Sequence, residues 1–172
     1  LLWSFLKNYF SERTTLITLI AFYLGTSIFY YATVETGMSH IYSLFQISLF
    51  LWTIKRVLKQ EKIDFRHGAL LGLAAGLILI TRPMNLFILP AYLLLDLGNG
   101  PGIKKRLHWL IGPGGALAIL ITFLVVLPQL FYWKYAYGQW IADGYEGESF
   151  KYLTNPQIHK VWFAPYNGIF VY

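Results

Sequence analysis

Long apolar blocks alternate with short charged clusters along this chain. The first block covers residues 15–34 and follows Lys7 and Arg13, and the second covers residues 38–54. A helix needs about 20 apolar residues to cross a hydrocarbon core of about 30 Å, and both blocks are close to that length. We therefore predict a transmembrane helix over each of them.

The third apolar block, residues 68–97, lies between two basic clusters, at residues 55–66 and 104–106. Lys and Arg gather in the cytoplasmic loops of membrane proteins. If both clusters are cytoplasmic, the block between them crosses the membrane an even number of times. This arrangement favours a helical hairpin over a single span.

The dipeptide Arg82-Pro83 at the middle of this block predicts the bend of the hairpin. Proline lacks a backbone donor and disfavours helical geometry in the residue before it. Each arm, residues 68–81 and 84–97, is about 21 Å of helix, which is too short to span the core. We expect Arg82 to lie below the outer surface, inside protein or beside a water-filled cavity. The alternative is one continuous helix, which would place the second basic cluster on the outer side.

The rest of the chain predicts one more complete span, over residues 107–131. An outer loop of mixed polar and aromatic residues follows at 134–165, and a further span begins at 167. The predicted fold class is all-α: a polytopic transmembrane helical bundle with a short broken helical hairpin around Arg82 and a partly helical outer loop. We expect residues 1–172 to form a single incomplete transmembrane domain, an internal piece of a longer protein, because the chain opens without Met and stops inside an apolar run.

The composition agrees with this topology. Hydrophobic residues make up 56% of the chain and charged residues 13%, whereas about a quarter of the residues of a soluble domain are charged. The net charge of +6 comes from clusters beside apolar spans, so we attribute it to membrane topology and not to nucleic-acid binding. The chain has no cysteine, which excludes disulfides and thiolate metal sites.

Arg82 is the leading candidate for chemistry. An ionisable group inside a membrane span indicates function, and the planar fork of arginine can bind two oxygens of a phosphate at once. We predict that Arg82 binds a lipid phosphate. The alternative is that its side chain only extends to the outer headgroups from a short helix.

Further polar residues are expected at the same outer face. Glu35 and His40 follow the first span and can form an acid/base pair. The alternative is that Glu35 is a solvated loop carboxylate and that His40 is an N-terminal helix residue hydrogen-bonded to its surroundings. In the outer loop, aromatic and acidic residues can stack on a sugar and bind its hydroxyls, or can form an interfacial amphipathic helix. We assign substrate binding to Glu35, His40, Asn85, Tyr145 and Glu148.

Five segments, in chain order, resemble the multi-spanning C-type glycosyltransferases, especially bacterial protein O-mannosyltransferases and aminoarabinose transferases. They cover most of the chain, although each alone is degenerate. The segments are Glu35-Thr-Gly-Met-Ser-His40-Ile-Tyr, Gly72-Leu-Ala-Ala-Gly-Leu-Ile-Leu-Ile-Thr-Arg-Pro-Met-Asn85, Leu127-Pro-Gln-Leu-Phe-Tyr-Trp, Gly147-Glu-Ser-Phe150 and Trp162-Phe-Ala-Pro-Tyr-Asn-Gly-Ile-Phe170.

The resemblance implies transfer of a sugar from a polyprenyl-phosphate donor to a lipid, glycan or protein acceptor. The reaction would take place at the periplasmic face of a bacterial inner membrane, among membrane lipids, with Arg82 as a phosphate ligand. In the family, the catalytic carboxylate lies in the first outer loop, which would place the general base upstream of residue 1. Glu35 is only a secondary candidate for that role. No cofactor is implied with certainty, and a divalent metal is compatible with the chemistry.

Two other functions remain open at this point. A lipid or sugar transporter or flippase would use the broken hairpin as a midplane site, and an inverted repeat would favour it. A membrane scaffold would have no catalytic site. No internal repeat is evident in the sequence.

The hairpin can be tested by cysteine labelling, because the chain has no cysteine of its own. We place single cysteines at Thr36, Gly100 and Asp143 of the full-length protein and treat intact cells with a membrane-impermeant maleimide. Thr36 and Asp143 should label from outside, and Gly100 only after the cells are opened. Labelling of Gly100 in intact cells would contradict the hairpin.

Overall fold

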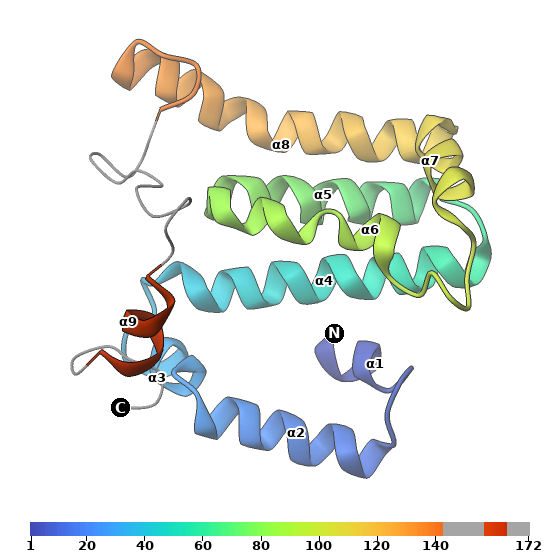
Figure 1. Ribbon diagram of the computed structural model, residues 1–172. Helices are drawn as coiled ribbons and strands as arrows, with labels where there is room; N and C mark the ends of the chain where they lie inside the picture. Colours follow the sequence, from blue (N-terminus) through green and yellow to red (C-terminus); the bar gives the residue numbers. More distant parts are fainter. Residues whose placement is uncertain (143–156, 165–172) are drawn as a thin grey trace. The chain divides into compact units, whose positions relative to one another are not determined.

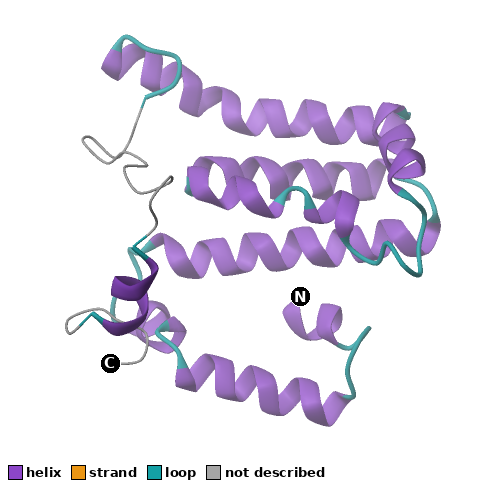
Figure 2. Ribbon diagram, in the orientation of Figure 1, coloured by secondary structure: helices purple, strands orange, loops and turns teal. Residues whose placement is uncertain are grey.

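The computed structural model describes residues 1–142 and 157–164, and every regular element in these two ranges is a helix. The chain divides into two compact units, Leu1–Trp140 and Ile141–Tyr172. The first unit contains helices α1 to α8, joined by short loops (Figure 2), and the second contains α9 (Ile158–Phe163). The all-α prediction is therefore confirmed for the described residues. Tyr145, Glu148 and the span expected from 167 lie outside them.

Three long helices form the centre of the first unit: α4 (Ser39–Gln60), α5 (Phe65–Thr81) and α8 (Pro113–Tyr137). Helix α5 lies between the other two and packs against both (Figure 1). It runs antiparallel to α4 and parallel to α8. With 22, 17 and 25 residues, α4, α5 and α8 are about 33, 26 and 38 Å long.

Helices α4 and α8 are long and apolar enough to cross a membrane. The most apolar window of α8 has a mean hydropathy of 2.2, and only 17% of that window is buried. A helix that is apolar on all sides but largely uncovered would be unfavourable in water. A hydrocarbon environment around α8 would remove that conflict.

Glycines let α5 and α8 approach at backbone distance. Gly68, Gly72 and Gly76 recur every four residues along one face of α5. A Cβ atom at Gly68 would lie 2.2 Å from the carbonyl oxygen of Gly114, and one at Gly72 would lie 2.3 Å from that of Ala118. Such small-residue contacts are a typical way for helices to associate in lipid, where hydrophobic burial contributes little.

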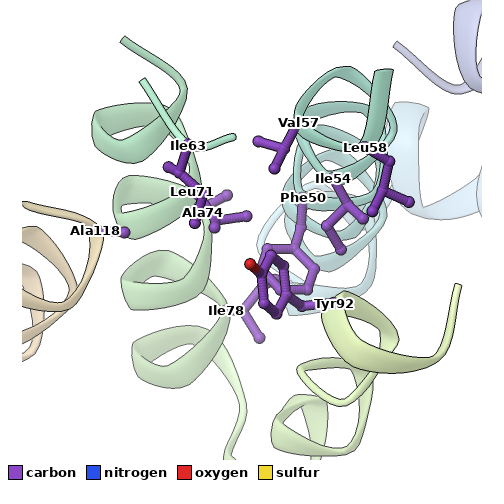
Figure 3. Close-up of a cluster of buried hydrophobic side chains, with 10 residues drawn as sticks. All are labelled: Phe50, Ile54, Val57, Leu58, Ile63, Leu71, Ala74, Ile78, Tyr92 and Ala118. Carbon is purple, nitrogen blue, oxygen red and sulfur yellow. The ribbon is translucent and has the colours of Figure 1, made fainter. Parts of the chain in front are cut away.

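The other face of α5 packs against α4 through branched side chains (Figure 3). Ile54 and Val57 of α4 meet Ala74 and Ile78 of α5, and all four are fully buried. Tyr92, from the segment after α5, closes the same cluster and is 5% exposed. The core thus joins α4, α5 and the segment that follows the bend.

Asp64 begins α5 as its N-cap. The carboxylate accepts hydrogen bonds from the backbone N–H of His67 at 2.8 Å and lies 2.7 Å from the ring Nδ1 of the same residue. These bonds to the charged form, the backbone bond first, hold the pKa of the Asp64 carboxyl below its usual value.

The break expected at Arg82 is present. Helix α5 ends at Thr81, and Arg82 is extended, with φ −152° and ψ 124°. The chain then turns back along α5 as a 3₁₀ helix, η1 (Pro83–Ile88), and a short helix, α6 (Ala91–Leu94). The prediction of one α-helical arm over 84–97 was wrong, because Pro90 interrupts the hydrogen-bond pattern a second time.

The two basic clusters lie at the same end of the first unit. Lys105 of the second cluster donates to Glu61 beside the first at 2.8 Å. Lys55 forms an ion pair with Asp96, which follows α6. The chain therefore returns after Arg82 to the end from which α5 started, as the hairpin requires.

Three predicted boundaries were wrong. The block 15–34 is divided into α2 (Glu12–Gly25) and α3 (Ile28–Thr33), because Thr26 is extended and its hydroxyl oxygen accepts from the backbone N–H of Ile28. Helix α4 continues six residues beyond 54. Since the long stems of Lys and Arg tolerate helical geometry, the basic cluster did not end it.

The span predicted at 107–131 is divided at Gly112 into α7 (Ile103–Ile111) and α8. Pro113 starts α8, because a missing N–H costs nothing in the first turn. Helix α8 then continues through Tyr137 into the region expected to be loop, and Gly138 ends it with a left-handed φ of 71°. The short helix α1 (Leu2–Leu6) packs against α4.

We predict that Gly72→Val destabilises the first unit, because the added side chain would meet the backbone of Ala118. Overpacking of this kind costs about 1–3 kcal/mol or more. Unfolding of the purified protein in mixed micelles of increasing SDS content, followed by circular dichroism, measures the change. Gly25→Val is the matched control, since no atom lies within 4 Å of a Cβ at Gly25. Equal unfolding midpoints for the two variants would show that the close approach is not needed.

Candidate functional site

Arg82 and His40 form the centre of the site. The bend after α5 brings Arg82 to the start of α4, where its Nη1 lies 3.2 Å from Nδ1 of His40. The ring of Tyr31, from α3, stacks on the imidazole with a centroid distance of 4.6 Å. Three segments that are separate in the sequence thus meet at one point.

The proton arrangement in this pair follows from the chemistry of arginine. A guanidinium has five N–H donors and no acceptor, so Nδ1 of His40 must accept. The remaining ring proton of His40 then lies on Nε2. His40 therefore orients one edge of the guanidinium, and no other residue of 1–142 or 157–164 forms a hydrogen bond with the side chain of Arg82.

The charge of Arg82 is not neutralised by any described residue. No carboxylate of residues 1–142 or 157–164 lies within 4 Å of its guanidinium, and its hydrogen bond goes to His40. The side chain is half-buried. A partly desolvated cation with free donors is a favourable place for an anion.

Arg82 lies near the aromatic end of α8. Gly76 of α5 packs against Val125 of α8, and the two helices run parallel. Gly68 and Gly72 face Gly114 and Ala118, so this register places Arg82 near the level of residues 128–131 of α8, about 9–14 Å before the end of that helix at Tyr137. Aromatic residues in the last turns of α8 are typical of a membrane interface. If α8 spans a membrane, the guanidinium lies just inside that interface.

Polar bonds to α4 fix both sides of the bend. Gln46 Nε2 donates to the hydroxyl of Thr81 at 2.8 Å, directly before Arg82. Asn85 Nδ2 donates to the hydroxyl of Ser43 at 2.9 Å, directly after the bend. Ser43 and Gln46 are buried. The backbone around Arg82 is thus attached to α4 on either side.

The predicted site residues are brought together only in part. Arg82, His40 and Asn85 lie at the bend, with the amide of Asn85 engaged by Ser43. Glu35 is exposed and accepts from the hydroxyl of Tyr30 at 3.2 Å, not from His40. The structure does not bring Glu35 and His40 together as a pair, because His40 faces Arg82. Tyr145 and Glu148 lie outside the described residues.

An apolar cavity begins one turn below the bend. Its volume is ≈ 420 Å³, and it lies between α5, α8 and the returning segment. Leu79, Ala75 and Leu71 line it along α5, with Ile119 and Phe123 opposite on α8. The cavity can hold an apolar chain.

Metal binding has no support in the described residues. Within residues 1–142 and 157–164, no group of three or more His, Cys, Asp and Glu side chains could hold a metal ion. The compatibility with a divalent metal stays a prediction.

Sequence reasoning missed the residues that hold the bend in place. Ser43 and Gln46 are spaced by three residues on α4, so they share a face, but nothing in the sequence indicates which helix they meet. Tyr31 lies within the apolar block 15–34, and its stacking on His40 depends on the break at Thr26. The four-residue spacing of glycines in α5 was a readable signal for close helix packing.

Comparisons of this chain with protein-family models, with curated proteins and with solved structures found no match in any of the three.

We predict an asymmetry between two variants at the bend. Thr81→Val leaves the buried amide of Gln46 without a partner, which should cost about 1–3 kcal/mol. Gln46→Leu removes that amide, including a buried Oε1 that has no partner, and should cost much less. SDS titration of both variants measures the difference. If Gln46→Leu is the more damaging change, the bond to Thr81 is not what holds the bend.

Proposed function

We propose that this chain is part of a membrane glycosyltransferase that moves a sugar from a polyprenyl-phosphate donor to an acceptor at the outer face of the membrane. In this proposal Arg82 binds the donor phosphate. The observation that carries it is a half-buried guanidinium at a break in the backbone, with free donors and no carboxylate among its described neighbours.

The reaction explains why an arginine would be needed there. The donor is a phosphodiester with one negative charge, and the bond between the anomeric carbon and the phosphate oxygen breaks in the transfer. Polyprenyl phosphate leaves with the electron pair, and its charge approaches −2. A pre-oriented guanidinium stabilises the charge that develops, and it does so more strongly where water is partly excluded.

The neighbours of Arg82 fit the role of positioning residues. His40 accepts from one guanidinium nitrogen and is itself stacked on Tyr31. Gln46 and Asn85 hold the backbone on either side of the bend. Holding the fork in one orientation reduces the entropy lost when a phosphate binds.

The apolar cavity offers a place for the isoprenoid chain of the donor. Leu79 lies three residues before Arg82, so the cavity starts within one helical turn of the proposed phosphate site. A phosphate held by Arg82 would then have its lipid chain directed between α5 and α8. Both parts of an amphiphilic donor would thus be accommodated.

The site would face the periplasm of a bacterial inner membrane. This orientation follows from the shared end of the two basic clusters, which the positive-inside rule places in the cytoplasm, and from the opposite location of Arg82. The acceptor would be a lipid, a glycan or a protein, and the general base is not assigned. No nucleic acid is involved.

Arg82→Ala should abolish most sugar transfer by the full-length protein. Loss of one group that stabilises developing charge lowers the rate by about 10²–10³. Transfer of labelled sugar from a polyprenyl-phosphate donor in proteoliposomes measures it. Arg82→Lys should retain part of the activity, because it keeps the charge but loses the planar fork.

Arg66→Ala is the matched control, since Arg66 is an exposed arginine in the first turn of α5, at the opposite end of that helix. It should transfer sugar at the wild-type rate. Wild-type transfer by Arg82→Ala would remove the assigned role. Movement of the intact donor across the bilayer without any transfer would favour a transporter instead.

A further inference from the structure

A second cavity lies at the basic end of α4, far from Arg82. Its volume is ≈ 340 Å³, and it lies between α1 and the last turns of α4. Small-molecule sites commonly occupy about 300–1,000 Å³, so the cavity is large enough for a lipid headgroup. His40 and Lys55 are 15 residues apart on α4, which separates the two sites by about 22 Å.

The wall of this cavity is positively charged. Lys55, Arg56 and Lys59 line it, and no acidic side chain does. Lys55 is neutralised by an ion pair with Asp96. Within residues 1–142 and 157–164, no carboxylate lies within 4 Å of Arg56 or Lys59. Two positive charges are therefore left without a counter-ion.

Contacts with α1 hold these cations in place. The guanidinium of Arg56 lies 4.3 Å from the centre of the Trp52 ring, and the indole N–H of Trp52 donates to the hydroxyl of Ser4 at 3.2 Å. Lys59 donates to the side-chain oxygen of Asn8 at 2.7 Å. This cation–π contact uses no N–H donor of Arg56, and no hydrogen bond joins its side chain to residues 1–142 or 157–164, so its N–H groups remain available for an anion.

The location of the cavity indicates what the anion is. It lies at the end of the molecule that carries both basic clusters, and Trp52 is a side chain typical of the membrane interface. The cytoplasmic leaflet carries anionic lipids, and basic pockets between membrane helices bind their headgroups. Arginine and lysine together suit a phosphate, because arginine binds two oxygens and lysine supplies a compact charge.

We propose that this cavity binds the phosphate group of an anionic phospholipid in the inner leaflet. The phosphate lies between Arg56 and Lys59, and the glycerol and acyl chains leave the cavity along α4 toward the bilayer. The site anchors α1 to α4 at the inner membrane surface. This proposal requires that α4 crosses the membrane, but it does not require that the protein transfers a sugar.

The test measures lipid binding to the full-length protein in a neutral detergent. Phosphatidylglycerol, phosphatidylcholine and inorganic phosphate are each titrated, and lipid retained by the protein is counted by native mass spectrometry. The wild-type protein should retain phosphatidylglycerol in preference to phosphatidylcholine. Millimolar inorganic phosphate should not displace it.

Arg56→Gln/Lys59→Gln should weaken phosphatidylglycerol binding by about thirtyfold, and each single substitution by about fivefold. Both side chains are exposed, so neither substitution disturbs the core. The matched control, Lys62→Gln/Lys104→Gln, removes the same charge from exposed residues outside the cavity and should bind like the wild type.

Three results would overturn the proposal. Equal retention of phosphatidylcholine would mean that the headgroup charge is not recognised. Equal losses in the two double variants would mean that the surface charge attracts lipid without a site. Displacement of phosphatidylglycerol by inorganic phosphate would assign the cavity to a soluble phosphate compound.

Discussion

The close contact between α5 and α8 is the constraint on which the rest of the first unit depends. Gly68 and Gly72 face the backbone of α8 directly and Gly76 makes room for the side chain of Val125, while Thr122 donates across the contact to the carbonyl oxygen of Gly72 at 3.1 Å. In lipid, association rests on such packing and on hydrogen bonds. Because this contact holds α5 from Gly68 to Gly76, it also fixes how far along α8 the end of α5 and the following bend lie.

A second arginine, Arg106, stabilises the segment that returns after the bend, at the end of the first unit opposite Arg82. Arg106 is fully buried and donates to the backbone carbonyls of Pro101, Tyr92, Leu93 and Leu95. These carbonyls come from the short helix α6 and the turns after it, where the backbone has few partners of its own. A buried carbonyl without a partner is costly, so one guanidinium replaces the missing helical bonds. The irregular return of the hairpin is stable because of this residue.

The sequence predicted the features that follow from local chemistry. Pro83 specified the bend at Arg82, and the two basic clusters specified that the chain returns to its starting end. It did not predict the break at Thr26 or the second interruption at Pro90, because an apolar block looks continuous when its bends contain few polar residues. The contacts of Ser43, Gln46 and Tyr31 depend on how three helices meet. The hydrophobic periodicity of a single helix does not indicate which other helix it will contact.

The comparison of Arg82 with Arg106 explains why only one of them suits a ligand. Arg82 lies in an apolar block and Arg106 in the second basic cluster, and neither has a carboxylate partner within 4 Å among residues 1–142 and 157–164. Arg106 is 0% exposed and donates from Nε and Nη1 to four carbonyl oxygens, while its Nη2 is buried and has no partner among the described residues. An anion could not reach this guanidinium without opening the packing around it. Arg82 makes one hydrogen bond to a neutral acceptor and remains half-exposed. Access separates the two arginines: an anion can reach the free donors of Arg82, whereas the guanidinium of Arg106 is enclosed and stabilises the backbone of the returning segment.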